Sequence, residues 1–192
     1  MSEPINKVAI IVATDLMGGI GRNGTIPWKI PMDTKWFAYA TSYPFIEGKL
    51  NAVVMGRKTW DSIPDSFKPL KNRLNFVISK STDTTSYPES VTLCKSYESA
   101  MEILLARDDV GKIFIMGGSH VYEQAIKDSR VVEILSTRVE GNHKCDKKFP
   151  SFGFIFKHHS NLFVDNLVVH MFTRPGHKPD KIDIANMFPK KI

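Results

Sequence analysis

Short runs of branched and aliphatic residues alternate along this chain with stretches of helical periodicity, and this alternation limits the possible folds more than any other feature. The runs have the length and composition of β-strands, and we place them at residues 8–14, 52–55, 74–79, 112–116, 131–139 and 161–172. Helical stretches separate most of them, at residues 32–41, 58–63, 97–106 and 119–128. The pattern predicts an α/β fold with a central, mostly parallel, mixed β-sheet flanked by helices. The last two strands have no helix between them and are expected to form an antiparallel C-terminal edge.

Size and composition are those of a single globular domain. The chain has 192 residues, of which 42% are hydrophobic and 24% are charged, so it can bury a core and is not disordered as a whole. From Pro175 onward, Gly176, Pro179 and Pro189 interrupt a polar stretch. We expect this C-terminal tail to lie on the surface or to be loose.

Several classes of protein are excluded by simple features of the sequence. The longest aliphatic run, residues 8–13, is far shorter than the ~20 residues of a membrane-spanning helix. No secretory signal precedes it, so we expect a cytoplasmic protein. Cys94 and Cys145 have no C-x-x-C spacing, and we expect two free thiols rather than a disulfide or a structural zinc site.

The charge balance favours anionic partners. Lys and Arg outnumber Asp and Glu by 26 to 20, which gives a net charge of +6 and a pI near 9.3. Phosphates, carboxylates or nucleic acids would suit this balance. The basic residues are dispersed, with local groups at residues 57–58, 144–148 and 190–191, and lack the aromatic interleaving of single-strand binders. A nucleic-acid partner is therefore not expected.

One carboxylate falls on an otherwise apolar helix face. If Pro31 begins a helix, then Asp33, Trp36, Phe37 and Ala40 share a face by their spacing of three, four and seven residues. No Arg or Lys four residues away on that face is placed to pair with Asp33. Two interpretations stay open: Asp33 caps the helix or faces solvent in its first turn, or it anchors a ligand or handles a proton.

Two predicted strands end in glycine immediately before a helix. Residues 52–55 lead into Gly56, and residues 113–116 lead into Gly117 and Gly118 before a helix that begins near His120. Glycine allows a phosphate to approach the backbone, and a helix N-terminus offers free N–H groups. Two such junctions in one sheet would suit the two ends of a dinucleotide, although ordinary turns between strand and helix also use glycine.

Three other motifs are misleading. Residues 19–24 have the letters G-x-G-x-x-G, but Pro27 follows too closely for the helix that a Rossmann fingerprint must open. Residues 56–59 resemble a phosphate loop but lack its upstream glycine. The His and Cys residues between positions 142 and 160 match no zinc-ligand spacing, so no metal is expected.

Four motifs then occur in a fixed order along the chain. They are residues 20–28 with Asp33 and Phe37, residues 54–64, Pro69-Leu70 with Arg73, and residues 115–118 with Val121-Tyr122. Over residues 8–174 they resemble the dihydrofolate reductase family. The resemblance implies one domain over residues 1–174, followed by the tail at 175–192. It also implies a monomer that transfers hydride from NADPH to C6 of dihydrofolate, with protonation of N5, and that binds antifolates such as methotrexate or trimethoprim.

The same resemblance implies roles for individual residues. Asp33 would bind the pterin and promote N5 protonation, with Thr137 supporting the carboxylate and Trp28 holding a water, and Arg73 would pair with the glutamate carboxylate of the substrate. The implied substrate-binding residues are Val12, Asp33, Phe37, Ile63, Leu70, Arg73, Met116 and Thr137. The implied cofactor-binding residues are Ala13, Ile20, Gly21, Gly56, Arg57, Lys58, Thr59, Ser79, Lys80, Met116, Gly117, Gly118, Ser119, His120, Val121 and Tyr122.

Among these residues, Arg57 and Lys80 are the candidates for the 2′-phosphate of NADPH. Residues 18–24, called the lid loop below, resemble the family's flexible lid, with Asp146 on a loop that contacts it. Thr34, Met116 and His120 depart from the family's usual residues, which affects the expected inhibitor profile and cofactor affinity more than the activity.

Two functions from other classes of protein remain as alternatives to a dihydrofolate reductase. One is a Rossmann-type dehydrogenase that uses residues 19–24, and the other is a basic nucleic-acid-binding α/β module. Neither accounts for Asp33, Arg73 and both glycine junctions together.

Overall fold

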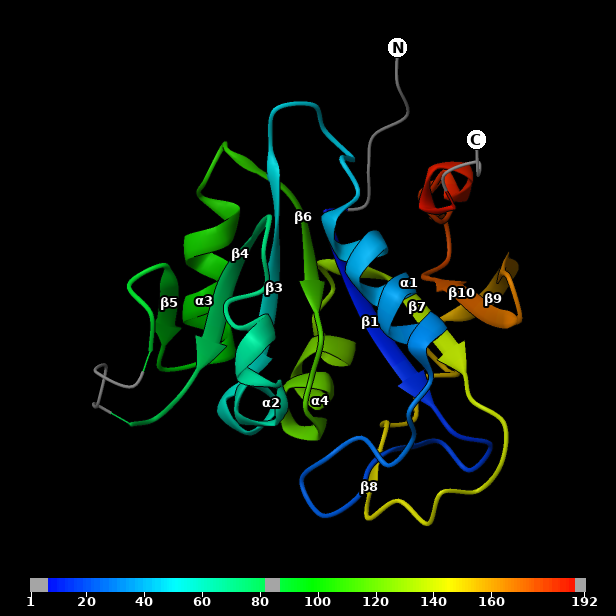
Figure 1. The fold of residues 1–192 in the computed structure, drawn as a ribbon. Coiled ribbons are helices and arrows are strands. Elements are labelled where there is room, and N and C mark those ends of the chain that lie inside the picture. The colour runs from blue at the N-terminus through cyan, green and yellow to red at the C-terminus, as the bar shows by residue number, and fades with distance from the viewer. Residues whose placement is uncertain (1–6, 82–86, 189–192) are drawn as a thin grey trace.

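The computed structural model describes residues 7–81 and 87–188, and these form a layered α/β structure around a mixed sheet of eight strands (Figure 1). The strand order is β5-β4-β3-β6-β1-β7-β10-β9. The strands are β1 (Val8–Thr14), β3 (Leu50–Gly56), β4 (Arg73–Ile78), β5 (Val91–Cys94), β6 (Val110–Ile115), β7 (Val131–Arg138), β9 (Lys157–Val164) and β10 (Leu167–Thr173). Pairing is parallel from β5 to β7 and antiparallel from β7 to β10 and β9. The predicted fold class is confirmed.

Helices cover both faces of the sheet. They are α1 (Pro31–Ser42), α2 (Arg57–Ser62), α3 (Tyr97–Leu105) and α4 (Ser119–Lys127), with short 3₁₀ helices η1 (Asp65–Phe67) and η2 (Ile184–Met187). The apolar residues of α3 and α4 belong to one core cluster, and those of α1 and η2 belong to the other. The sheet thus separates an α1 face from an α3/α4 face.

The central strands are apolar on both sides because helices cover both faces. In β1, Val8, Ile10 and Val12 pack toward α3 and α4, whereas Ala9 and Ile11 pack toward α1. This period of two decides which side chain of a strand can reach which face.

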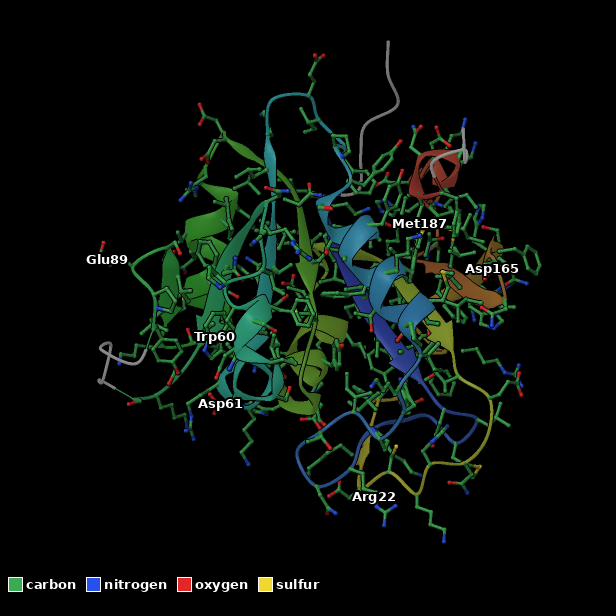
Figure 2. All side chains as sticks on the ribbon, in the orientation of Figure 1. Arg22, Trp60, Asp61, Glu89, Asp165 and Met187 are labelled. Carbon is green, nitrogen blue, oxygen red and sulfur yellow. The ribbon has the colours of Figure 1, made fainter. Side chains whose placement is uncertain are left out.

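One predicted strand was wrong in its extent. Residues 157–173 form a hairpin of β9 and β10 rather than a single strand at 161–172. Asp165, at the tip of the hairpin in Figure 2, has a φ of 53°. Aspartate tolerates this left-handed conformation better than most residues, so the chain can reverse within an apolar stretch.

Three short strands were not predicted from the sequence. β5 has four residues, and β2 (Gly19–Gly21) pairs with β8 (Lys147–Lys148) in a separate two-stranded sheet. The segment 19–24 therefore begins as a strand and opens no helix. The alternative of a Rossmann-type fingerprint there was wrong, for the reason that Pro27 indicated.

The tail beyond Arg174 is in contact with the rest of the structure as far as residue 188. Ile182 and Met187 are buried in the cluster on the α1 face, and Met187 is labelled in Figure 2. Pro189 and the basic pair at residues 190–191 lie outside the described residues. The division into a domain and a tail at residue 174 remains a prediction. No helix in the described part of the chain is long and apolar enough to cross a membrane.

Candidate active site

Asp33 lies in the first turn of α1, at the end of the helix that begins with Pro31. The N-cap of α1 is Ile30, and no side chain caps this end, so Asp33 is not a capping residue. Burial raises the pKa of the Asp33 carboxyl above its ordinary value of 3.8, and hydrogen bonding by Thr137 and Trp28 opposes that rise. The geometry therefore argues against a helix cap and favours the interpretation of Asp33 as a carboxylate that anchors a ligand or handles a proton.

No positive charge compensates Asp33. Among residues 7–81 and 87–188, Asp33 takes part in no ion pair. Nearby, the indole Nε1 of Trp28 is buried and has no hydrogen-bond partner of normal geometry. Trp28 is close enough to Asp33 to lower its pKa, yet its N–H forms no full hydrogen bond, and a ligand or water bound beside the carboxylate would complete one. The pair of Asp33 and Trp28 therefore fits a polar ligand.

Arg73 lies at the opposite end of α1. Its Nη1 donates a hydrogen bond of 2.8 Å to Thr41 Oγ1 in the last turn of the helix, and its Nε donates to the carbonyl of Lys71 at 2.9 Å. Partial burial lowers the pKa of Arg73. In the part of the chain that the structure describes, no carboxylate pairs with this guanidinium. One helix thus separates an unpaired anion from an unpaired cation.

Apolar side chains on the α1 face accompany these two charges. Phe37, Ile63, Leu70 and Met116 all belong to the cluster on that face, with Leu70 buried and the other three partly buried. Four of the predicted substrate-binding residues are therefore brought onto the same face as Asp33. An aromatic ligand with a polar head and an anionic end would match this arrangement.

Val12 is the exception among the predicted substrate-binding residues. Its side chain packs in the α3/α4 cluster, so only its backbone could contact a ligand on the α1 face. Ala13 is the register partner of Thr137 on the neighbouring strand. The alternation of β1 therefore places Ala13, rather than the side chain of Val12, toward Asp33.

The two glycine junctions lie side by side and are hydrogen-bonded to each other. Gly56 N donates to the carbonyl of Gly117 at 2.7 Å, and α2 and α4 begin directly after Gly56 and Gly118 without a capping side chain. A Cβ on Gly118 would lie 3.3 Å from Thr59 Oγ1, and one on Gly117 only 2.9 Å from the Tyr122 ring. The close approach of these segments, and the φ of 108° at Gly117, require glycine.

The remaining predicted cofactor residues are spread around these junctions. Arg57, Lys58 and His120 are exposed, whereas Ser119 is partly buried. Ser79 is buried at the end of β4 and precedes exposed Lys80. Val121 and Tyr122 are buried, and the Tyr122 hydroxyl donates to the carbonyl of Ile11 at 2.9 Å. Val121 and Tyr122 therefore support the core behind the junctions.

Ile20 and Gly21 lie in the lid loop, which is tied to the segment from Gly141 to Phe149. Asp146 N donates to Gly21 O at 3.0 Å, and Asn23 N donates to the Asp146 carboxylate at 3.2 Å. The expected contact between Asp146 and the lid loop is confirmed.

Asp15 is a further buried carboxylate that the sequence analysis did not single out. It accepts hydrogen bonds from the backbone N–H groups of Met17, Gly19 and His143, at 2.7 to 3.0 Å. Burial acts to raise the pKa of Asp15, but these backbone hydrogen bonds outweigh it and hold the pKa below its ordinary value. Its position between a strand and a glycine-rich loop was the available signal. Asp15 anchors the base of the lid loop.

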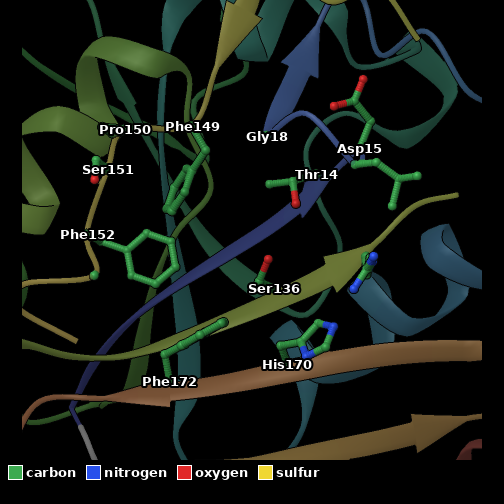
Figure 3. Close-up of a pocket in the computed structure, with 13 residues that line it drawn as sticks. Thr14, Asp15, Gly18, Ser136, Phe149, Pro150, Ser151, Phe152, His170 and Phe172 are labelled. Atoms are coloured by element: carbon green, nitrogen blue, oxygen red, sulfur yellow. The ribbon is translucent and has the colours of Figure 1, made fainter. Parts of the chain in front are cut away.

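A cavity of about 470 Å³ opens beside this anchor and contains none of the predicted site residues (Figure 3). It is lined by Thr14, Ser136, His170, and the rings of Phe149, Phe152 and Phe172, among others. Ser136 precedes Thr137 on β7, and alternate side chains of a strand face opposite sides. The cavity therefore lies across the sheet from Asp33.

Within the described residues, no group of three or more His, Cys, Asp and Glu side chains is arranged to hold a metal ion.

Comparisons with known proteins agree with one another. The family model described as dihydrofolate reductase matches residues 7–164. The chain is 40% identical over 142 residues to a dihydrofolate reductase of Drosophila melanogaster, covering 74% of this chain and 78% of the fly protein. It is 34% identical over 149 residues to a dihydrofolate reductase of Aedes albopictus, covering 76% and 80%.

A longer relative matches through only part of its length. The chain is 36% identical over 171 residues to a bifunctional dihydrofolate reductase-thymidylate synthase of Glycine max. The match covers 85% of this chain but 32% of the soybean protein. The chain therefore spans about a third of this bifunctional relative.

Proposed function

The chain belongs to the dihydrofolate reductase family, and we propose that it catalyses the NADPH-dependent reduction of 7,8-dihydrofolate to 5,6,7,8-tetrahydrofolate. Hydride is transferred to C6 and a proton is added at N5. The observation that carries the proposal is the half-buried Asp33 carboxylate, which forms no ion pair with any described residue and lies beside Thr137 and Trp28.

Asp33 can act on the pterin in two ways. Its carboxylate accepts hydrogen bonds from the N–H groups of an amidine-like ring edge, a charge-assisted interaction. Because burial raises its pKa, it also holds a proton at a higher pH than an exposed aspartate would. The indole N–H of Trp28 is available to orient a water that passes a proton toward N5.

The other end of the substrate is assigned to Arg73. A guanidinium suits a carboxylate because it can donate two parallel hydrogen bonds. Thr41 already holds one edge of this guanidinium, which fixes its direction before a ligand arrives. The partly buried side chains of Phe37 and Ile63 and the buried side chain of Leu70 would pack against the pterin and the benzoyl ring.

The glycine junctions fit a dinucleotide cofactor on the observations given above. The backbone at Gly56 and Gly118, together with Thr59 and Ser119, would hold the phosphates, while Ala13 and Ile20 would border the nicotinamide. When bound, NADPH supplies the hydride. Exposed Arg57 and Lys80 provide the positive charge for the 2′-phosphate that distinguishes NADPH from NADH.

This last assignment has a direct test in the variant Lys80→Ala. We expect it to weaken NADPH binding about tenfold, because one charge-assisted hydrogen bond is lost, and to leave NADH binding nearly unchanged. Fluorescence titration with each cofactor measures both dissociation constants. Equal losses for NADH and NADPH would show that another residue binds the 2′-phosphate.

We further propose that the protein acts as a cytoplasmic monomer and supplies tetrahydrofolate to one-carbon metabolism. Antifolates such as methotrexate or trimethoprim would bind at Asp33 through the same ring edge as the substrate. Thr34 and His120 are exposed and Met116 is partly buried on the α1 face. Of these three departures, Met116 is placed to alter inhibitor affinity by direct contact.

The activity itself is tested by following NADPH oxidation after dihydrofolate is added to the purified protein. We expect rapid oxidation that methotrexate stops, with NADH as a slower parallel substrate. A folded protein that binds neither dihydrofolate nor NADPH would contradict the proposal. Salt-dependent binding to DNA in place of NADPH binding would favour the nucleic-acid alternative.

A further inference from the structure

The C-terminal segment at residues 180–188, called the brace below, reaches back over the α1 face. It begins at a buried group of charges: Lys112 of β6 forms ion pairs with Glu133 of β7 and with Asp180. The side chains of Lys112 and Glu133 are 0% and 1% exposed, and that of Asp180 is 9% exposed. The backbone N–H of Asp180 also donates to Glu133 Oε1 at 2.9 Å. The brace is thus attached to the centre of the sheet.

From this attachment the brace contacts α1 at three further places. The Tyr39 hydroxyl donates to the backbone carbonyl of Asp183. The Lys35 ammonium lies 4.7 Å from the centre of the Phe188 ring, which is within cation–π range. Met187 is 3% exposed and is buried with Trp36 of α1 in the same cluster.

The helix that the brace contacts is the one that orders both charges of the candidate site. Asp33 belongs to its first turn, and Thr41 in its last turn holds Arg73. Asn51 of β3 also donates to the carbonyls of Thr41 and Tyr43 at the end of the helix. That end is therefore fixed to the sheet independently, whereas the brace contacts Lys35 and Tyr39 in the middle of α1.

We propose that Asp180, Asp183, Met187 and Phe188 of the brace are positioning residues for the substrate: the brace fixes α1 against the sheet and so sets the distance and direction between Asp33 and Arg73. This inference rests on the proposed function for its substrate. The cofactor junctions follow the last residues of β3 and β6, whereas the brace is attached to Lys112 near the start of β6, so we expect the effect to be specific to the substrate half of the site.

The first test uses variants that loosen the brace without removing it. Tyr39→Phe deletes one hydroxyl, Met187→Ala removes one buried side chain, and their combination removes both contacts. Lys181→Ala is the matched control, because Lys181 is an exposed residue of the same segment. For the double variant we expect a rise in KM for dihydrofolate of between about tenfold and 100-fold, since small misplacements remote from the chemistry have effects of this size.

The expected rise in KM is accompanied by an unchanged dissociation constant for NADPH. A merely structural loss would lower the thermal midpoint and weaken both ligands together, so the split between substrate and cofactor is the informative readout. If the double variant does not fold, Tyr39→Phe alone is measured, with a smaller rise of about threefold expected from one hydrogen bond. A KM equal to that of Lys181→Ala, or equal losses for both ligands, would overturn the proposal.

A second measurement is independent of catalysis. Amide hydrogen exchange reports local opening of a helix, and we expect faster exchange in α1 of Met187→Ala than of Lys181→Ala, with no change in α4. If the wild-type protein lacks dihydrofolate reduction but α1 still shows this difference, the proposed function fails and the brace stands. Unchanged exchange in α1 would reject the brace itself.

Discussion

A buried and a half-buried carboxylate on the α1 face, Glu133 and Asp33, differ in their surroundings. Glu133 and Thr137 lie on β7 four residues apart, so both side chains face α1. Glu133 forms an ion pair with Lys112, the ammonium of which also pairs with Asp180. Asp33, which lies beside Thr137, forms no ion pair with any described residue. Near one end of β7 the charge of Glu133 is compensated by Lys112, whereas beside the other end the charge of Asp33 on α1 is not compensated by any described residue.

The difference in pairing distinguishes a carboxylate that stabilises the fold, Glu133, from one that is proposed to act on a ligand, Asp33. Burying an unpaired charge costs several kcal/mol. At Glu133 the buried ammonium of Lys112 offsets this cost. Under the proposed function, the hydrogen-bonding partner of the Asp33 carboxylate arrives with the ligand. Burial raises the pKa of both Asp33 and Glu133, but Lys112 opposes the rise only at Glu133.

The largest effect is expected when the uncompensated charge is removed. Asp33→Asn should lower turnover at neutral pH by about 10²- to 10⁴-fold, the usual contribution of a positioned acid or base, with partial recovery on acidification. The exposed hairpin substitution Asp165→Asn is the matched control. Steady-state NADPH oxidation measures the change, and rates like those of the wild type across the pH range would contradict the role of Asp33.

Asp33→Asn, which lowers the activity, is expected to leave the stability unchanged or to raise it. Because burial raises the folded-state pKa of Asp33, its stabilising contribution is complete below the unfolded pKa and is lost as pH rises through the folded one. Once ionised, the Asp33 carboxylate therefore lowers the free energy of unfolding. Asp33→Asn should unfold at the same temperature as the wild type or a higher one.

Removing the compensating cation is the second test of the comparison. Lys112→Met leaves Glu133 and Asp180 buried without their cation and should reduce the free energy of unfolding by about 3–5 kcal/mol. The deficit should shrink as the pH falls from about 7 to about 5, because burial raises the pKa of Glu133 and its protonation removes a buried charge. Urea unfolding at the two values measures this. A loss below about 1 kcal/mol would mean that the charges are hydrated rather than buried.

A smaller effect is expected from Thr137→Val, which removes a hydroxyl next to Asp33 and keeps the side-chain shape. Hydrogen bonding by Thr137 lowers the pKa of Asp33, so the variant should shift the acid limb of the pH profile upward. Turnover should fall about threefold to tenfold, as expected for one hydrogen bond. Combining Thr137→Val with Asp33→Asn provides the control, since additive losses would show that the two side chains do not interact.

Much of this organisation could be predicted from local patterns in the sequence. The helical spacing around Asp33 identified a charge on an apolar face, and the glycines at 56 and 117–118 identified the junctions, with close contacts at Gly117 and Gly118 disfavouring a larger residue. The hairpin at Asp165 was missed because a turn of two residues inside an apolar run leaves little compositional signal. β5 was missed because four residues are too few to show a period.

Long-range contacts account for what the sequence could not show. Lys112, Glu133 and Asp180 are separated by 21 to 68 residues, and no local pattern relates them. The prediction of a surface tail therefore gave no indication that residues 180–188 pack against α1. For Val12, the family resemblance implied a contact but not that its side chain faces away from α1.

The central claim, that Asp33 handles the proton, is tested most directly by the pH dependence of the hydride-transfer rate. Single-turnover NADPH oxidation with excess protein should decline with rising pH through one ionisation whose pKa lies above the ordinary 3.8 of aspartate. The account predicts that this ionisation disappears from the profile of Asp33→Asn. An identical ionisation in both proteins would contradict it, because the titrating group would then be another one.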